Sequence, residues 1–210
     1  MEIYSSEEQQ VEAIKRFWDQ YGKAILGGVI LGLAVLYGFR FYQGQQRANA
    51  EQASVQFSQL IEKRTDNASE DWLAQAQGFI DGSSKDAYSV MAALLAAKDA
   101  VALKQYDKAE TQLNWVLAQA KEPAVLALTQ LRLARLQREQ GKLDAALATL
   151  STAVPQGFVA MQAELKGDVL VQAERLAEAK AAYQLALENA GENTQLLQVK
   201  LDDLAHVTAA

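Results

Sequence analysis

The sequence has no cysteine, only two prolines and a single histidine. The lack of cysteine excludes disulfide bonds, thiolate nucleophiles and sulfur-ligated metals. The scarcity of proline, together with an abundance of alanine, leucine and glutamine, favours helices throughout. Basic residues are outnumbered by acidic ones, 20 to 26, and the resulting net charge of −6 argues against general affinity for nucleic acid, which requires a basic surface.

Charge is also missing from one segment near the N-terminus. No charged side chain occurs from Ala24 to Phe39, a stretch that contains four glycines. A helix that faces water needs a polar stripe every three to four residues, and none is present here. Extended from Tyr21 to Tyr42, the segment would rise about 33 Å as a helix, enough to cross a hydrocarbon layer of about 30 Å. We therefore predict an uncleaved transmembrane helix over residues 23–42, placed in the lipid bilayer.

Two other interpretations of this segment are open. It could be the central helix of a soluble domain, although the remainder of the chain looks self-sufficient. It could also be a cleaved signal peptide, because Ala48-Asn49-Ala50 has the form of a cleavage site, although the region before it is long and acidic. Within the span, Gly28 and Gly32 form a GxxxG pair that could let a second helix pack closely. Glycine is also simply tolerated in membrane helices.

Residues 1–22 are predicted to form a cytoplasmic amphipathic tail. Ser6 and Gln9 have the spacing of a capping box that opens a helix. The helix could lie on the membrane surface or bind another protein. Three basic residues precede the uncharged run from Ala24 to Phe39 and two follow it, so the positive-inside rule leans toward a cytoplasmic N-terminus. The apolar residues that recur every three or four positions along the tail are Val11, Ile14, Trp18 and Tyr21.

Residues 43–210 contain a repeated phrase, whose three copies start at Gln105, Gly141 and Arg175 and align at Tyr106, Leu143 and Leu176. The offsets of 37 and 33 residues bracket the period of about 34 that is typical of tetratricopeptide repeats. In each phrase a small residue is followed by a larger one and then by another on the same helical face. In repeat order these are Ala109, Ala146 and Ala179, then Leu113, Leu150 and Tyr183, then Val116, Ala153 and Ala186.

Each phrase follows another amphipathic run, so each pair is predicted to form a helical hairpin. A small residue in the first helix, Ala97, Ala134 or Gly167, would let the second helix approach closely. The predicted fold is all-α, an N-terminal transmembrane helix followed by a tetratricopeptide-like helical-hairpin solenoid over residues 43–210. The predicted first helices of the hairpins are 90–103, 126–140 and 159–172, and the turns after them are 104–105, 140–141 and 173–174. A further helix pair is predicted between 48 and 80, with cap and turn residues at 67–71. A last helix is predicted over 194–206.

No catalytic constellation is present. Nucleophilic and metal catalysis usually recruit histidine or cysteine, and the only histidine is His206, four residues from the C-terminus. No phosphate-binding glycine loop follows a predicted strand. We therefore expect no enzymatic activity, no metal and no cofactor.

A solenoid offers instead a concave surface lined by the first helix of each hairpin. Methionines mixed with both signs of charge suit adaptable peptide binding, although they could equally be core or solvated residues. The predicted partner-binding residues are Met91, Leu94, Lys98, Val101, Leu128, Leu131, Arg135, Arg138, Met161, Glu164, Asp168 and Val171.

The first 43 residues contain the segments "EIY", "QVEAIKRF" and "YGKAILGGVILG", and the repeats contain "LRLARLQ" and "GKLDAALATL". The first three segments carry a resemblance, which covers the whole chain, to the YfgM family, ancillary subunits of the bacterial Sec translocon. The two repeat segments add support. The resemblance implies an inner-membrane protein of Gram-negative bacteria, with a cytoplasmic N-terminus and a periplasmic repeat domain. It also implies association with the SecYEG translocon, with a membrane-anchored parvulin-type periplasmic chaperone and with translocating client proteins.

Four hypotheses follow. The first is a membrane-anchored scaffold or co-chaperone beside the translocon that helps to hand translocated proteins to periplasmic chaperones. The second is a regulator of a stress-response system, acting on a cytoplasmic response regulator through the N-terminal tail. The third and fourth, an enzyme and a homo-oligomer formed through Gly28 and Gly32, have less support.

Overall fold

The computed structural model describes residues 5–64, 68–82, 87–191 and 194–205, with side chains from residue 11 onward except Ala13. Over these ranges the chain forms α-helices and one short 3₁₀ turn, and it contains no strand. The prediction of an all-α fold is confirmed. The chain divides into two compact units, Met1–Gln52 and Ala53–Ala210, and each is described by itself.

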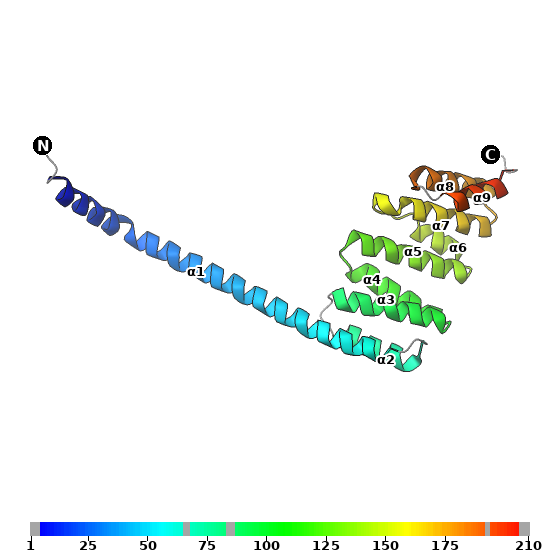
Figure 1. The fold of residues 1–210 in the computed structure, drawn as a ribbon, viewed down its shortest axis with the longest axis horizontal. Coiled ribbons are helices and arrows are strands. Elements are labelled where there is room, and N and C mark those ends of the chain that lie inside the picture. Colours follow the sequence, from blue (N-terminus) through cyan, green and yellow to red (C-terminus); the bar gives the residue numbers. More distant parts are fainter. Residues whose placement is uncertain (1–4, 65–67, 83–86, 192–193, 206–210) are drawn as a thin grey trace. The chain divides into compact units, whose positions relative to one another are not determined.

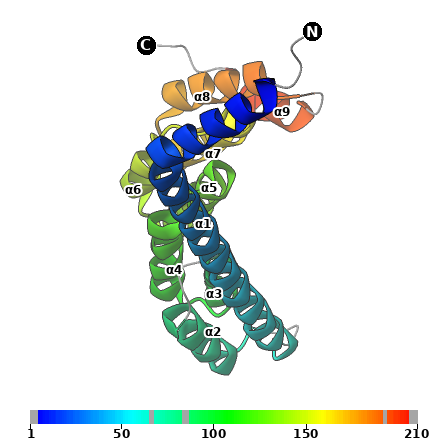
Figure 2. The same cartoon turned by 90° about the vertical axis from the view of Figure 1, so that its left-hand side faces the viewer.

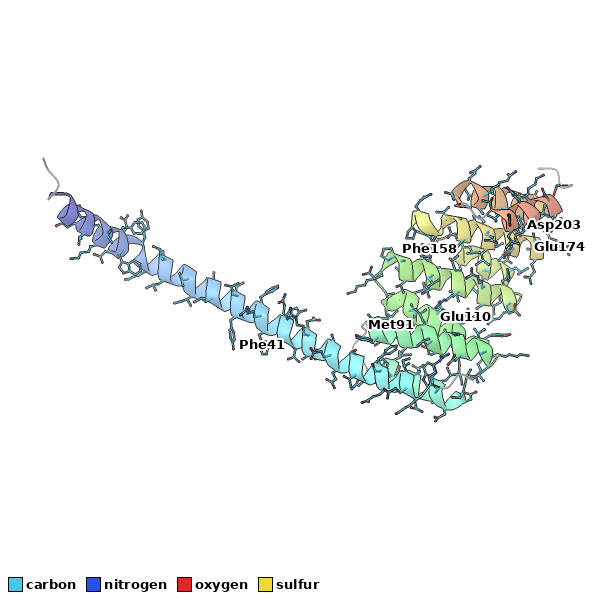
Figure 3. All side chains as sticks on the ribbon, viewed as in Figure 1. Phe41, Met91, Glu110, Phe158, Glu174 and Asp203 are labelled. Carbon is cyan, nitrogen blue, oxygen red and sulfur yellow. The ribbon has the colours of Figure 1, made fainter. Side chains whose placement is uncertain are left out.

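The first unit consists of helix α1 (Ser5–Glu62), which continues into the second unit. An 18-residue window of α1 has a mean hydropathy of 1.9, and none of it is buried inside the fold. Figure 3 shows large side chains on both sides of the helix around Phe41, and Tyr37 is 77% exposed. The interpretation as a buried core helix is therefore wrong, and α1 has the length and composition of a membrane-spanning helix. Ala48 to Ala50 lie within α1.

The second unit is a stack of helices that follow one another in chain order (Figure 1). Three hairpins form its centre, and Figure 2 shows α4 and α6 on one side of the stack with α3 and α5 on the other. The predicted hairpin solenoid is therefore confirmed. Its elements are α2 (Glu70–Gly82), α3 (Ala87–Ala102), α4 (Tyr106–Gln119), α5 (Pro123–Glu139), α6 (Leu143–Thr149), the 3₁₀ turn η1 (Gln156–Phe158), α7 (Val159–Gln172), α8 (Leu176–Asn189) and α9 (Gln195–Asp203).

Small residues hold the two helices of each hairpin together. The predicted alanines of the second helices, Ala109, Ala146 and Ala179, are all 0% exposed, and the larger residues that follow them are 3% exposed. At Gly167 on α7 the approach is close enough that an added Cβ would lie 2.3 Å from Cε1 of Tyr183 on α8. No side chain larger than hydrogen fits at this position unless the tyrosine ring moves.

The same turn closes each hairpin. Lys104, Gly141 and Glu174 have positive φ angles of 59°, 72° and 58°. In each turn, the N–H of the following residue donates to a carbonyl five residues earlier, as in Gln105 N to Ala100 O at 2.8 Å. This is the Schellman arrangement that ends many helices, in which the left-handed residue is usually glycine. Only one of the three turns has glycine at this position.

Helix α6 is shorter than predicted. It ends at Thr149, so Ala153 is exposed outside the helix, and its predicted equivalence to the buried Val116 is wrong. The Ser151 hydroxyl donates to the carbonyl of Ala148 at 2.6 Å, a bond that competes with the continuing helix. Pro155 then disfavours helical backbone in the residue before it.

Residues 53–62 of α1 belong to the second unit and pack against α2 and α3. Ser69 caps α2 by accepting a hydrogen bond from the N–H of Trp72, as the predicted cap chemistry requires. The Trp72 ring nitrogen donates to the carbonyl of Leu60 at 3.1 Å. Arg64 lies 5.5 Å from the Trp72 ring centroid and forms two bonds to Asp99, at 2.6 and 2.9 Å. The compact unit begins at Ala53, and residues 43–52 are exposed on α1. The predicted boundary between the span and the repeat domain at residues 42 and 43 stays a prediction.

Replacing Gly167 by alanine should destabilise the solenoid by about 1–3 kcal/mol, because the added Cβ would displace the Tyr183 ring, which is buried and held by a hydrogen bond to Asp168. Gly78→Ala is the matched control. Gly78 is exposed on α2 with nothing within 4 Å, so this change should stabilise by about 1 kcal/mol. Urea unfolding of the purified chain in detergent, followed by circular dichroism, measures both. Equal effects of the two changes would contradict the close approach.

Replacing Glu174 by glycine should raise the free energy of unfolding by up to about 1 kcal/mol, because glycine adopts a positive φ without strain. Gly141→Ala should lower it by about the same amount for the opposite reason. The same unfolding measurement applies. A destabilised Glu174→Gly variant would show that the left-handed turn is not strained.

Candidate partner-binding groove

A cavity of about 670 Å³ lies among α3, α4 and α5. We call it the groove. Its volume falls within the range of about 300–1,000 Å³ that is common for ligand sites. The apolar residues that line it are Leu94, Leu95, Ala97, Val101, Tyr106, Leu113 and Leu136, and the charged ones are Lys98, Arg132, Arg135, Arg138 and Glu139.

The groove brings together five of the predicted partner-binding residues. Leu94, Lys98 and Val101 reach it from α3, and Arg135 and Arg138 reach it from α5. Sequence reasoning missed Arg132, Glu139 and the contribution of α4. The arginines at intervals of three in "LRLARLQRE" are the signal that could have identified Arg132, because this spacing keeps the three on neighbouring positions of one helix face.

The other predicted residues lie outside the groove. Met91, Met161 and Val171 are exposed by 41%, 42% and 38%, and Leu128 is half-buried. Leu131 is placed in the core instead, with 1% exposed, where it clusters with alanines and leucines of the second and third hairpins. Figure 3 labels Met91 on α3.

Asp168 is the centre of a charged network on α7. One of its oxygens accepts from Arg138 of α5 at 3.3 Å, and the other accepts from Lys200 of α9 at 2.6 Å and from the Tyr183 hydroxyl at 2.8 Å. Lys200 also donates to Glu164 at 2.7 Å. Glu164 and Asp168, both predicted to contact a partner, are therefore engaged by the C-terminal helix.

Burial raises the pKa of Tyr183, and the hydrogen bond to the Asp168 carboxylate raises it further. Burial acts to lower the pKa of Lys200, but its hydrogen bonds to Asp168 and Glu164 outweigh burial and raise it. Lys200 also lies 5.4 Å from the centroid of the Tyr183 ring. Both groups therefore keep their protons more firmly in the folded chain than in the unfolded one.

Three predictions concern features outside the groove: the glycine pair of the span, the capping box with the single histidine, and the expected absence of a metal. Gly28 and Gly32 lie on α1, and beyond the adjacent helix backbone no atom lies within 4 Å of an added Cβ, so the packing of a second helix there stays a prediction. His206 and the side chains of Ser6 and Gln9 lie outside the described residues. Among the residues that are described, no three histidine, aspartate or glutamate side chains gather in a way that could hold a metal ion.

Residues 15–206 match the family described as "Tetratricopeptide repeat-like domain". Similar proteins named "Ancillary SecYEG translocon subunit" occur in several bacteria. The relative in Escherichia coli K12 is 32% identical over 98% of this chain and 100% of its own length, and that in Haemophilus influenzae is 32% identical over 94% and 97%. The relative in Neisseria gonorrhoeae is 32% identical over 97% of this chain and all of its own length.

The free energy of unfolding should fall as the pH rises above about 10, because the unfolded chain then loses protons that Tyr183 and Lys200 retain when folded. Tyr183→Phe removes one of the two groups and should reduce this alkaline loss. Urea unfolding at a series of pH values measures it. A Tyr183→Phe variant with an undiminished loss would contradict the role given to the tyrosine.

Proposed function

Because the chain belongs to the YfgM family of ancillary SecYEG translocon subunits, we propose that it is a membrane-anchored, non-catalytic scaffold that associates with the translocon. The observation that carries the proposal is the combination of an exposed apolar helix with a repeat domain that contains an open groove. An anchor confines encounters to the membrane plane, so modest contacts can hold a complex through high effective concentration.

The proposed orientation places the N-terminus in the cytoplasm and the repeat domain in the periplasm of a bacterial inner membrane. The charge balance across α1 supports it, with Lys15, Arg16 and Lys23 before the apolar run and Arg40 and Arg47 after it. The proposed domains are therefore the tail over 1–22, the span over 23–42 and the periplasmic repeats over 43–210.

The proposed partners are SecYEG, a membrane-anchored parvulin-type periplasmic chaperone and translocating client proteins. The scaffold would help to hand clients from the channel to the chaperone by holding both close together. A contact surface on the first helices of the hairpins is supported by the exposure of Met91, Met161 and Val171. Flexible methionine side chains can adapt to more than one partner.

A second candidate function involves the tail. Ile14 is 67% exposed and Trp18 is 53% exposed on α1, so an apolar stripe is available to a cytoplasmic response regulator. Deleting residues 1–20 while the span is kept should abolish regulation if the tail is the working part. Unchanged signalling in that deletion would leave the scaffold as the function.

The scaffold is tested by photocrosslinking in intact membranes. A crosslinking residue placed at Met91, Arg135 or Met161 should capture the chaperone, a subunit of the translocon or a client. The control position is Gln184, which is exposed on α8, outside the groove and away from the three test positions in sequence. Capture at Gln184 alone, or of neither translocon nor chaperone at any position, would reject the scaffold.

A further inference from the structure

The charge of the groove is opposite to that of the chain. The whole sequence has a net charge of −6. Among the described residues that line the groove, four are basic and one is acidic, so the lining has a net charge of 4 − 1 = +3. A concave site with one sign of charge concentrates ligands of the opposite sign. We therefore expect the groove to attract anionic groups, although the chain as a whole is acidic.

The basic side chains of the groove are available to a ligand. Lys98, Arg132 and Arg135 are exposed, and within the described part of the chain they form no ion pair. Arg138 differs, because it is half-buried and paired with Asp168 at 3.3 Å. Three positive charges on two helices can thus accept new carboxylate partners without breaking a bond of the fold.

The remaining lining of the groove is apolar. Leu94 and Val101 flank Lys98 on α3, and Leu136 follows Arg135 on α5. A ligand that matches this surface needs aliphatic side chains between its negative charges. A cavity of about 670 Å³ holds a few side chains, and a flat bilayer surface has no protrusion that could enter it.

We propose that the groove binds a segment of a partner protein in which aspartate or glutamate alternates with aliphatic residues. Lys98, Arg132 and Arg135 pair with the carboxylates, and the leucines and Val101 receive the aliphatic side chains. The inference rests on the proposed scaffold function and gives the chemistry of the segment that the scaffold holds.

The test uses the full chain in nanodiscs of neutral phosphatidylcholine and measures the fluorescence anisotropy of labelled peptides. A short peptide that alternates leucine with glutamate should bind, and its affinity should fall as ionic strength rises. A peptide that alternates leucine with lysine should not bind. A peptide that alternates serine with glutamate should bind more weakly, because it lacks the apolar part.

The charges of the groove are tested by the double variant Lys98→Glu with Arg135→Glu. It should weaken binding of the leucine–glutamate peptide by about tenfold or more, because two attractive pairs become repulsive. The matched control is Lys63→Glu with Lys121→Glu. These lysines are exposed, do not line the groove and give the same change in net charge. The control should change the affinity less than about twofold. Unchanged circular dichroism and melting temperature show that both variants fold.

Three outcomes would overturn the inference. The basic peptide could bind as well as the acidic one, or the control pair could cost as much affinity as the groove pair. Alternatively, soluble dihexanoyl-phosphatidylglycerol could occupy the groove while no acidic peptide binds, which would assign it to a lipid headgroup.

Failure of the inference can be told from failure of the scaffold function. If only the ligand class is wrong, photocrosslinks from Met91 and Met161 to the translocon or chaperone persist in membranes. If the scaffold function is wrong, those crosslinks are absent, whichever peptide binds in nanodiscs.

Discussion

The repeat domain depends on the close approach of paired antiparallel helices. Small residues at the contact points let the two helices come together. Ala109, Ala146 and Ala179 are inaccessible to solvent because a neighbouring helix covers each of them. At Gly167 the approach is so close that only hydrogen fits beside the ring of Tyr183. A single hairpin leaves its outer apolar face uncovered, so the hairpins must stack, and stacking creates the surface formed by their first helices.

That surface has two regions, one in which the charged side chains pair with each other and one in which they do not. Toward the C-terminus, Lys200 pairs with the carboxylates of Glu164 and Asp168, and Arg138 also pairs with Asp168. Asp168 accepts a further hydrogen bond from the Tyr183 hydroxyl. Toward the N-terminus, the basic side chains of α3 and α5 face a cavity with few acidic neighbours. The same repeat pattern therefore produces an internally paired region beside a region that can accept a ligand.

The sequence predicted what depends on periodicity. The hairpins, their turns, the small buried positions and the apolar helix all follow from spacings within a few turns of helix, and the structure has them. The prediction wrongly placed Ala153 on the buried face of α6. The helix ends at Thr149, where the Ser151 hydroxyl bonds to a backbone carbonyl, and the repeat spacing does not reveal this end. Leu131 was assigned to the surface although it lies in the core, because a small error in helical phase separates the two faces. The partners of Asp168 come from α5, α8 and α9, and no local pattern indicates which distant cation reaches a given carboxylate.

The raised pKa values of Tyr183 and Lys200 affect how alkaline extraction of this protein from membranes is interpreted. Washing vesicles with strongly alkaline carbonate is a common way to separate integral from peripheral proteins. Such a wash favours unfolding at the C-terminal end of the solenoid, because the unfolded chain releases the protons that Tyr183 and Lys200 retain when folded. The run from Ala24 to Phe39, in contrast, has no charged side chain to lose. Retention of the polypeptide after the wash would therefore report on α1 alone. A companion protein released by the same wash could have left because the end of the solenoid loosened, so its release would not show that it was only weakly bound.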